Sequence, residues 1–407
     1  MKKIIKKYHK TRVSFWNTVS IEWNAIKSDK AVVGTFLSIT IILLFVYTYV
    51  YSNEVVHEVP VAIVNQDASK TSRDFSEMIN ASDGIKTITK YTDIQEAKHA
   101  YYSKKIQGIV IIPKNFEKDL RRGKQATIST FADASNMVFY KKVLGDITIA
   151  TGYFNAGISI KKELSKGSTF KKASKDYSPI IGISRSLFNT SSGYATYMIP
   201  MLTALIIQLV LLMGIGILNG SRQENKTIRL NFPRLLHFGG TIPILLGKAF
   251  LYGAIFSVIL PIQIGIIYFI FDIPIRSSLG LVLLFLIPYL LSVVFIGIAI
   301  STLFKKREDS IIFLVLISIP SLMLSGLSFP KEGFSNFYHI ISNIIPSTHG
   351  INGFVKLTQM NASFNEIWKD WSYLWILTFL YSIIAIISLK LRAYKEMKSL
   401  QSEINDN

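Results

Sequence analysis

Long apolar runs recur along the chain and are separated by polar segments. A helix crosses about 30 Å of hydrocarbon with about 20 residues, and each run approaches or exceeds that length. The pattern predicts six membrane spans, at residues 31–51, 194–218, 249–271, 278–304, 310–328 and 372–389. Thirty residues precede the first run and no small-residue cleavage site follows it. We therefore interpret it as an uncleaved span rather than a signal peptide.

Residues 52–193 have a different pattern, which is typical of a folded domain outside the membrane. Short β-branched runs predict strands at 59–64, 85–91, 107–112 and 126–131, and amphipathic stretches predict helices at 70–81, 94–105, 114–122 and over 136–175. Alternating strands and helices favour a mixed α/β sheet. A segment of about 140 residues can bury a core of its own. Since the chain has no cysteine, that core has no disulfide to support it.

Two further segments are apolar but are not predicted to span the membrane. Residues 1–30 are basic, with apolar side chains at helical spacing, which predicts an amphipathic helix along the inner membrane face. A solvated basic leader is the alternative interpretation. Residues 338–356 are apolar but contain Pro346, Gly350 and Gly353, which favours a re-entrant or interfacial outer hairpin.

The formal net charge of +19 is concentrated on one side of the predicted topology. Both termini and the loops on their side hold 20 basic and 8 acidic residues, the short loops on the other side hold 4 and 4, and residues 52–193 hold 21 and 14. Lys and Arg are enriched in short cytoplasmic loops, so both termini are predicted to be cytoplasmic. The surplus indicates topology and contact with lipid headgroups, and no nucleic-acid partner is expected.

These patterns predict a mainly α-helical membrane protein with six transmembrane helices and a mixed α/β extracytoplasmic domain inserted between the first and the second. The predicted parts are a cytoplasmic amphipathic helix at 1–30, the first span at 31–51, the extracytoplasmic domain at 52–193, a five-helix region at 194–391 with a cytoplasmic loop at 219–243 and an outer hairpin at 338–356, and a cytoplasmic tail at 392–407.

The available side chains argue against several kinds of chemistry. No Asp, Glu, Lys or Arg lies well inside a predicted span, which disfavours coupling to an ion gradient. Gln208 and Gln263 are the most polar interior residues, and interhelical hydrogen bonds explain them better than substrate contact. The Gly247–Lys248 pair lacks the other residues of a phosphate-binding loop. The six histidines have no zinc-site spacing. We predict no metal site, no catalytic residue and no enzymatic activity.

Four short motifs accompany this topology. In chain order they are VPVAIVNQDAS at 59–69, Tyr194 or Tyr197 before Pro200, Arg222, Glu224 and Thr227 followed by Gly247 and Lys248, and SGLSFP at 325–330 with Pro346 in the hairpin after it. Together with the topology, they resemble the ABC-2-type permeases of ATP-binding-cassette exporters, in the subgroup with a large extracytoplasmic domain. The resemblance covers nearly the whole chain, although Lys226 stands where the family usually has glycine.

The resemblance implies a permease subunit that moves a substrate out across a bacterial cytoplasmic (inner) membrane. It implies that a separate ABC ATPase subunit binds ATP and Mg, that this chain carries no cofactor, and that a second permease subunit, identical or paralogous, completes the pathway. It leaves a periplasmic adaptor open. The residues it marks are Arg222, Glu224, Thr227 and Lys248 as candidates for coupling to the ATPase, and Gly326, Phe329, Pro330 and Pro346 as candidates for an outer gate.

A non-transporting protein is the alternative function. In that case the outer domain would be a surface receptor, or a scaffold of an envelope or secretion complex. The interrupted outer hairpin and the cytoplasmic loop that resembles a coupling segment favour the transporter, because a simple membrane anchor needs neither. An apolar pathway without fixed charge fits drugs, lipids, peptides, haem and polymers alike.

Overall fold

The computed structural model describes residues 2–53, 55–88, 91, 93–177, 187–190, 193–225, 240–326 and 328–405. The chain divides into two compact units. We call Val55–Arg185 the inserted domain. We call the other unit, formed by Met1–Glu54 together with Ser186–Asn407, the helical unit.

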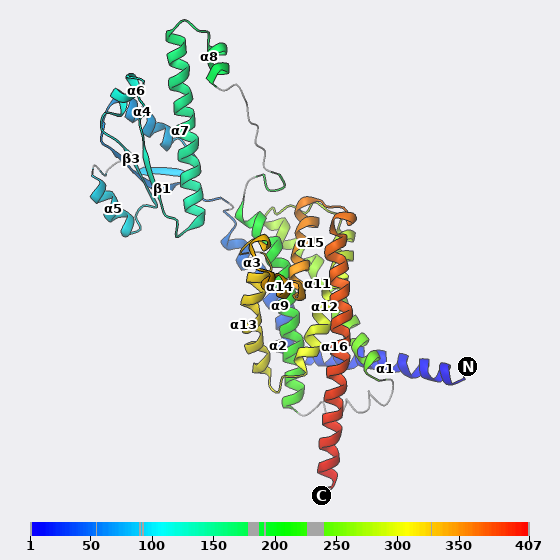
Figure 1. Cartoon of the computed structure of the whole chain (residues 1–407). Coiled ribbons are helices and arrows are strands. Elements are labelled where there is room, and N and C mark those ends of the chain that lie inside the picture. Colours follow the sequence, from blue (N-terminus) through cyan, green and yellow to red (C-terminus); the bar gives the residue numbers. More distant parts are fainter. Residues whose placement is uncertain are drawn as a thin grey trace. The chain divides into compact units, whose positions relative to one another are not determined.

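A four-stranded sheet forms the centre of the inserted domain (Figure 1). The strands are β1 (Val59–Asn65), β2 (Ile85–Ile88), β3 (Gly108–Ile112) and β4 (Ser129–Ala132), in the spatial order β2-β1-β3-β4. β1 is parallel to β2 and β3, and β4 is antiparallel to β3. Consecutive residues of β1 are buried because helices cover both faces of the sheet. The predicted mixed α/β sheet is present.

Helices cover this sheet on both sides. They are α4 (Lys70–Asn80), α5 (Ile94–Tyr102), α6 (Phe116–Arg121) and α7 (Met137–Ser165), and the short helix α8 (Phe170–Tyr177) packs against α7. Ile63 of β1 packs in one core with Phe75 of α4 and Ile147 of α7, and Val64 packs in the other core with residues of α5. The stretch predicted as one helix over 136–175 is two helices, with Gly167 between them at φ +87°, which favours glycine.

The VPVAIVNQDAS motif shapes the connection from β1 to α4. The side-chain oxygen of Asn65 accepts hydrogen bonds from the backbone N–H groups of Asp67 and Ala68, both at 3.1 Å. Ser69 caps α4 by accepting from the N–H of Ser72. A carboxylate oxygen of Asp67 also accepts from the backbone N–H of Glu117, at the start of α6. The motif therefore fixes how the sheet, α4 and α6 meet.

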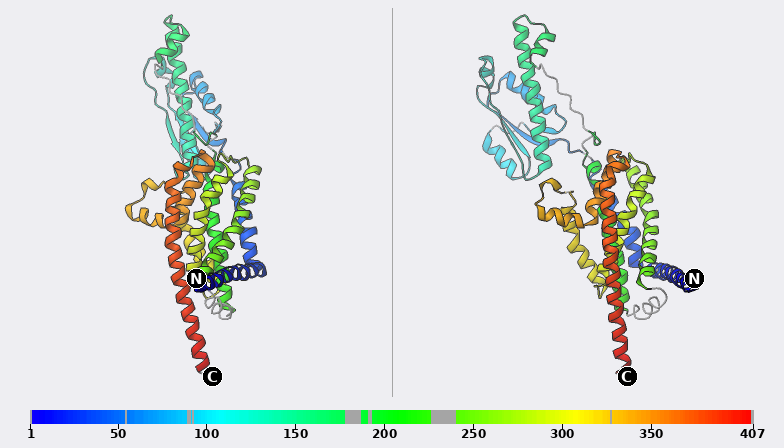
Figure 2. Two further views of the ribbon diagram at one scale, coloured as in Figure 1. Left: turned by 90° about the vertical axis from the view of Figure 1, so that its right-hand side faces the viewer. Right: turned by 45° about the vertical axis from the view of Figure 1, so that its right-hand side comes forward.

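The helical unit is a bundle that α1 crosses at one end (Figures 1 and 2). Its elements are α1 (Lys2–Ser28), α2 (Lys30–Gly34), the π-helix η1 (Thr35–Ile39), α3 (Thr40–Val50), α9 (Tyr194–Glu224), α11 (Thr241–Ile270), α12 (Leu279–Ser301), α13 (Arg307–Leu324), the 3-10 helix η2 (Lys331–Gly333), α14 (Asn336–Ile344), α15 (Pro346–Met360) and α16 (Phe364–Asn405). We call the end where α1 lies the α1 end, and the opposite end, where α15 ends and α16 begins, the α15 end. α9 is the most enclosed of the apolar helices, with 83% of its apolar window buried.

Five helical segments among the described residues are long and apolar enough to cross a membrane. They are Lys30–Val50, Tyr194–Glu224, Thr241–Ile270, Leu279–Ser301 and Phe364–Lys395. The remaining predicted span, 310–328, corresponds to α13. That helix has 18 residues, and its first turn contains Arg307, Glu308 and Asp309. The charges precede the predicted span, and the helix ends at Leu324, four residues before the predicted end, so its apolar stretch is shorter than the sequence pattern had indicated.

The predicted outer hairpin at 338–356 is more regular than its sequence suggested. Pro346 occupies the first turn of α15, where its missing N–H costs no helical hydrogen bond. Gly350 and Gly353 do not interrupt the helix. A Cβ atom at Gly350 would lie 2.5 Å from the ring of Tyr289, and one at Gly353 would lie 2.2 Å from the ring of Phe285. These glycines let α15 pack closely against α12.

Candidate functional site

A single buried carboxylate joins three helices at the α1 end. Glu22 of α1 is 1% exposed. Its Oε1 accepts hydrogen bonds from Nζ of Lys248 at 3.0 Å and from the hydroxyl of Tyr252 at 2.6 Å, both on α11. Its Oε2 lies 2.7 Å from Nη1 of Arg222, on the last turn of α9. Two cations and a hydroxyl therefore satisfy one anion that is closed off from solvent.

The charges around Glu22 keep it ionised. Burial alone raises the pKa of this carboxyl, but the positive charges of Arg222 and Lys248, with hydrogen bonds from Tyr252 and Lys248, outweigh burial and lower its pKa from 4.5 to about 2. At neutral pH the group is a carboxylate that holds its partners by charge as well as by hydrogen bonding.

This lowered pKa predicts a pH dependence of stability. The pKa of Glu22 is lower in the folded chain than in the unfolded chain, so its contribution to stability is fully present above about pH 4.5 and is lost as the pH falls toward its folded pKa. We expect the melting temperature of the purified chain in detergent to fall more steeply below about pH 5 than that of the Glu22→Gln variant. Parallel melting curves of the two proteins over this range would contradict the assignment.

A second ion pair lies beside the first. Oδ2 of Asp29, between α1 and α2, is 2.8 Å from Nη2 of Arg307 at the start of α13. The same guanidinium donates to the hydroxyl of Ser221 on α9 at 2.7 Å. Asp29 also caps α2, where its Oδ1 accepts from the N–H groups of Ala31 and Val32. We call Glu22, Asp29, Arg222, Lys248, Tyr252 and Arg307 together the α1-end cluster.

Two glycines bring the backbones of this cluster together. A Cβ atom at Gly220 of α9 would lie 2.4 Å from the carbonyl oxygen of Lys306, so only glycine lets α9 approach the start of α13 this closely. A Cβ atom at Gly247 would lie 3.0 Å from both the carbonyl oxygen of Phe15 and the Cβ of Thr18, on α1. Gly220 directly precedes Ser221, which accepts a hydrogen bond from Arg307, and Gly247 directly precedes Lys248 of the cluster.

The structure brings together two of the four predicted coupling residues, Arg222 and Lys248, on either side of Glu22. Glu224 is exposed at the end of α9. Thr227 and the rest of residues 226–239, which include most of the predicted loop 219–243, lie outside the described residues. Two boundaries differ from prediction, because α9 continues through Glu224 and α11 begins at Thr241. Lys248 therefore lies within a long apolar helix rather than before it.

Glu22 itself was not among the predicted site residues. Its signal in the sequence is that it is the one acidic residue of α1, which carries seven Lys and Arg residues. The amphipathic pattern alone does not predict which residues pair with Glu22, because Arg222 and Lys248 lie about two hundred residues away along the chain.

The four predicted outer-gate residues lie in two turns, one after α13 and one at the start of α15, beside the middle of α9. Gly326 follows α13 with φ +89°, and a Cβ atom there would lie 3.0 Å from the side chain of Lys331. Phe329 is exposed and stacks on Phe334, and Pro330 precedes η2. Pro346 is buried at the start of α15. Lys331 joins the two turns, since its Nζ donates to the carbonyl oxygen of Thr348 at 3.0 Å.

Buried polar contacts connect α9 to these turns. Oε1 of Gln208 accepts from the backbone N–H of Ser347 in α15 at 2.9 Å, and its Nε2 donates to the hydroxyl of Ser321 in α13 at 3.3 Å. This confirms the interpretation of Gln208 as an interhelical hydrogen-bonding residue. The amide nitrogen of Gln263 has no partner within the described residues, so the same interpretation is not supported there.

One further charged group lies near the α15 end. Asp370 of α16 pairs with Lys356 at 2.7 Å and lies 3.5 Å from Nδ1 of His349, both on α15. Within the described ranges, no group of three or more His, Cys, Asp or Glu residues is arranged to hold a metal ion. The ion pairs of Glu22 with Arg222 and Lys248, of Asp29 with Arg307 and of Asp370 with Lys356 link helices of this unit.

Comparison with known proteins identifies relatives along most of the chain. The model of the ABC-2 family transporter proteins matches residues 30–387. ABC transporter G family member 23 of Dictyostelium discoideum is 23% identical over 341 residues, which cover 81% of this chain and 46% of that protein. The probable multidrug ABC transporter permease YbhR of Escherichia coli is 22% identical over 313 residues, covering 76% of this chain and 80% of its own length.

A third relative, the inner membrane transport permease YhhJ of Escherichia coli, is 21% identical over 284 residues, covering 69% of this chain and 71% of its own length. The chain thus spans about half the length of the Dictyostelium protein and most of the length of the two bacterial ones.

Proposed function

Because the chain belongs to the ABC-2 family of transporter proteins, we propose that it is the transmembrane permease subunit of an ATP-driven exporter. It is a multi-pass membrane protein with a transport permease role, and ABC-2 permeases work with an ATPase partner. In the proposal, ATP and Mg bind to that separate subunit and a second permease completes the pathway. The chain lies in a bacterial inner membrane with both termini in the cytoplasm and with α13 as its sixth span.

The α1-end cluster is the observation that carries this proposal. A push from an ATPase must reach the membrane helices through elements that move together. Separating α1 from α9 or α11 would leave a buried charge without its partner, which costs about 3–5 kcal/mol. α1, the end of α9 and the start of α11 therefore behave as one body, on which a partner can act from the α1 end.

The helix α9 gives a route from this body to the start of α15, in the middle of the bundle. It is the most enclosed helix, it carries Arg222 at the α1 end, and Gln208 within it contacts the first turn of α15. In the proposed mechanism, closure of the ATPase shifts α1 and α9 together. The shift reaches Ser347 and the turns around Gly326 and Pro346, where the exit opens.

Two features indicate a substrate class. One relative is named as a probable multidrug ABC transporter permease, and the middle of the bundle is apolar. Both features support the efflux of apolar organic compounds. An apolar solute would cross such a path without a charged group having to leave water.

Glu224 provides a test of where the ATPase binds. Because Glu224 is exposed at the end of α9, we expect Glu224→Ala to leave the melting temperature unchanged. We expect the same change to weaken ATPase binding by about 0.2–1 kcal/mol and to reduce the dependence of binding on salt, since a complementary charge is lost. Glu308→Ala, at another exposed acid of the same end, is the matched control. Equal binding and equal salt dependence of the Glu224→Ala variant and the wild type would remove Glu224 from the docking surface.

The proposed function is tested by isolating the full chain from its host in mild detergent, identifying the proteins that accompany it and assaying ATP hydrolysis. We expect a stoichiometric ATPase. Isolation with envelope or secretion components and no nucleotide-binding protein would favour the receptor or scaffold instead.

A further inference from the structure

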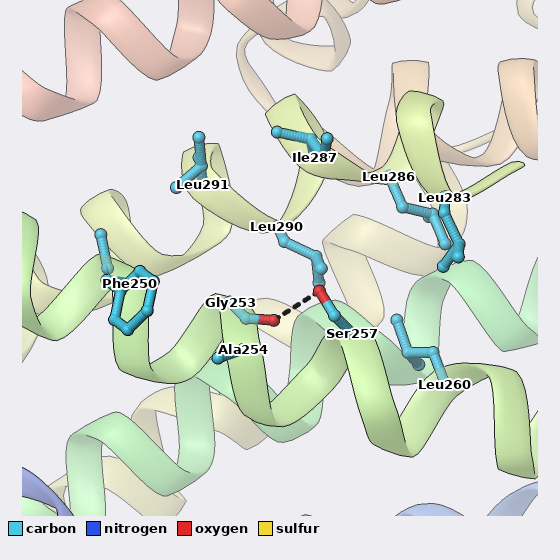
Figure 3. Close-up of a pocket in the computed structure, with 11 residues that line it drawn as sticks. Phe250, Gly253, Ala254, Ser257, Leu260, Leu283, Leu286, Ile287, Leu290 and Leu291 are labelled. Atoms are coloured by element: carbon cyan, nitrogen blue, oxygen red, sulfur yellow. Dashed lines mark hydrogen bonds between the residues drawn. The ribbon is translucent and has the colours of Figure 1, made fainter. Parts of the chain in front are cut away.

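The two units differ in the apolar surface that they expose. In the helical unit, a groove of 280 Å³ between α11 and α12 is lined mainly by leucines and small residues (Figure 3). The hydroxyl of Ser257 in its lining donates to the carbonyl oxygen of Gly253 at 2.7 Å. This lining carries no charge, so it does not identify a ligand. In the inserted domain, exposed apolar side chains lie among lysines instead.

These lysines gather where α7 ends and α8 follows. α7 extends past the sheet, and Phe154 is its last residue in a core of the domain (Figure 1). α8 packs against α7, and its Ala173 is only 1% exposed. Residues 161–177 contain six lysines and two acidic residues, a surplus of +4 within a segment, 52–193, whose whole surplus is +7. We call residues 161–177 the lysine tip.

Lysines from both helices of the tip surround one carboxylate. Nζ of Lys166 lies 2.7 Å from Oε1 of Glu163. The hydrogen bond from Lys166, with the positive charges of Lys166, Lys162 and Lys172, lowers the pKa of Glu163. One anion therefore faces three ammonium groups. The tip has four more charged residues, which are exposed and take part in none of the ion pairs among the described residues: Lys161, Lys171, Lys175 and Asp176.

Apolar side chains are exposed between these lysines. Phe170 is 65% exposed, Tyr177 is 42% exposed and Leu164 is 40% exposed. Phe170 begins α8, directly before Lys171 and Lys172. A soluble polyanion would pair with the lysines and leave these apolar side chains in water. A lipid surface accommodates both kinds, because lysines lie at the headgroups while apolar side chains enter the layer beneath.

We propose that the lysine tip binds the surface of a bilayer that contains anionic lipids. In this arrangement Phe170 enters the headgroup layer and the lysines lie against anionic headgroups. The charge identifies an anionic partner and Phe170 identifies one with an apolar layer, so the two features together point to lipid. The inference rests on side chains of the inserted domain alone, and it does not depend on whether the chain exports a solute.

The charged half of the proposal is tested with the full chain in nanodiscs of phosphatidylcholine, to which vesicles of phosphatidylglycerol or of phosphatidylcholine are added. Because the chain has no cysteine, Thr169→Cys carries a single environment-sensitive fluorophore beside Phe170. We expect co-flotation with phosphatidylglycerol vesicles and a blue shift of the fluorophore. Lys171→Gln and Lys172→Gln should each weaken this binding about fivefold. Lys118→Gln with Lys124→Gln, at two exposed lysines in and after α6, is the control and should bind as the wild type does.

The apolar half is tested by Phe170→Ser. This change should weaken binding about tenfold and remove the blue shift, because the exposed ring is lost while the lysines remain. Equal binding of the two kinds of vesicle by the wild type would overturn the proposal, as would equal affinity of Phe170→Ser and the wild type. Equal affinity of the lysine variants and their control would also overturn it. Binding of vesicles without a blue shift, together with tighter binding of soluble polyphosphate, would overturn it in favour of a soluble polyanion.

Discussion

Replacing Glu22 with glutamine should lower the free energy of unfolding of the helical unit by about 3–5 kcal/mol at neutral pH. The change removes the negative charge and leaves the buried Lys248 beside Arg222, whose side chain is 18% exposed. Two like charges with no anion between them repel, and Lys248 cannot reach water without separating the helices. Thermal or denaturant unfolding of the purified chain in detergent, followed by circular dichroism, measures the effect.

Glu224→Gln is the control for this experiment, because it makes the same chemical change at an exposed position at the same end of the bundle. It should change the free energy of unfolding by less than about 0.5 kcal/mol. If Glu22→Gln were as stable as Glu224→Gln, Glu22 would not be the link that holds α1 to α9 and α11.

Substituting Gly220 with alanine should destabilise the helical unit by about 1–3 kcal/mol. The added Cβ would lie 2.4 Å from the carbonyl oxygen of Lys306, and this atom belongs to the backbone and has no rotamer to change. α9 and the start of α13 must therefore move apart, which also lengthens the contact between Arg307 and Ser221. The same unfolding measurement applies.

An opposite result is expected at Gly265 of α11. A Cβ atom there meets nothing within 4 Å, so Gly265→Ala gains helix propensity without a clash and should raise stability by up to about 1 kcal/mol. The two changes are chemically identical. A stability loss of the same size at both positions would mean that close approach of the backbones is not the reason for glycine at 220.

Local patterns predicted the elements of the fold well. Short β-branched runs located β1 and β3 to within one residue at each end, since these strands are buried and carry a strong signal. Prediction from local patterns failed where a contact with a residue far away in the sequence determines the structure. Gly350 and Gly353 read as breaks in a helix, but they lie inside α15 because the rings of Tyr289 and Phe285 occupy the space of their side chains.

The candidate site shows the same limit. The resemblance to a family marked Arg222 and Lys248, but as charges available to a partner protein. In the structure they are largely enclosed around Glu22, and their role is to hold helices together. The sequence pattern did not indicate this, because the partners of the single acid in this basic amphipathic helix lie on helices that follow far along the chain.

The rate of ATP hydrolysis by the permease–ATPase complex tests the central claim, that the α1-end cluster transmits motion between the ATPase and the bundle. The chain has no cysteine, and a Cβ at Gly247 would lie 3.0 Å from that of Thr18, so a shift of about 0.5 Å between α1 and α11 brings the pair into the range of about 3.5–4.5 Å found in disulfides. Thr18→Cys with Gly247→Cys can therefore replace the link between α1 and α11 by a covalent bond.

We would measure this rate in lipid vesicles for Glu22→Gln carrying the two cysteines, before and after oxidation. The account predicts that stimulation of hydrolysis by the permease is lost in the reduced variant, returns when the disulfide forms, and is lost again on reduction. Stimulation that is the same in the oxidised and reduced states would contradict it, because the link between α1 and α11 would then have no part in coupling.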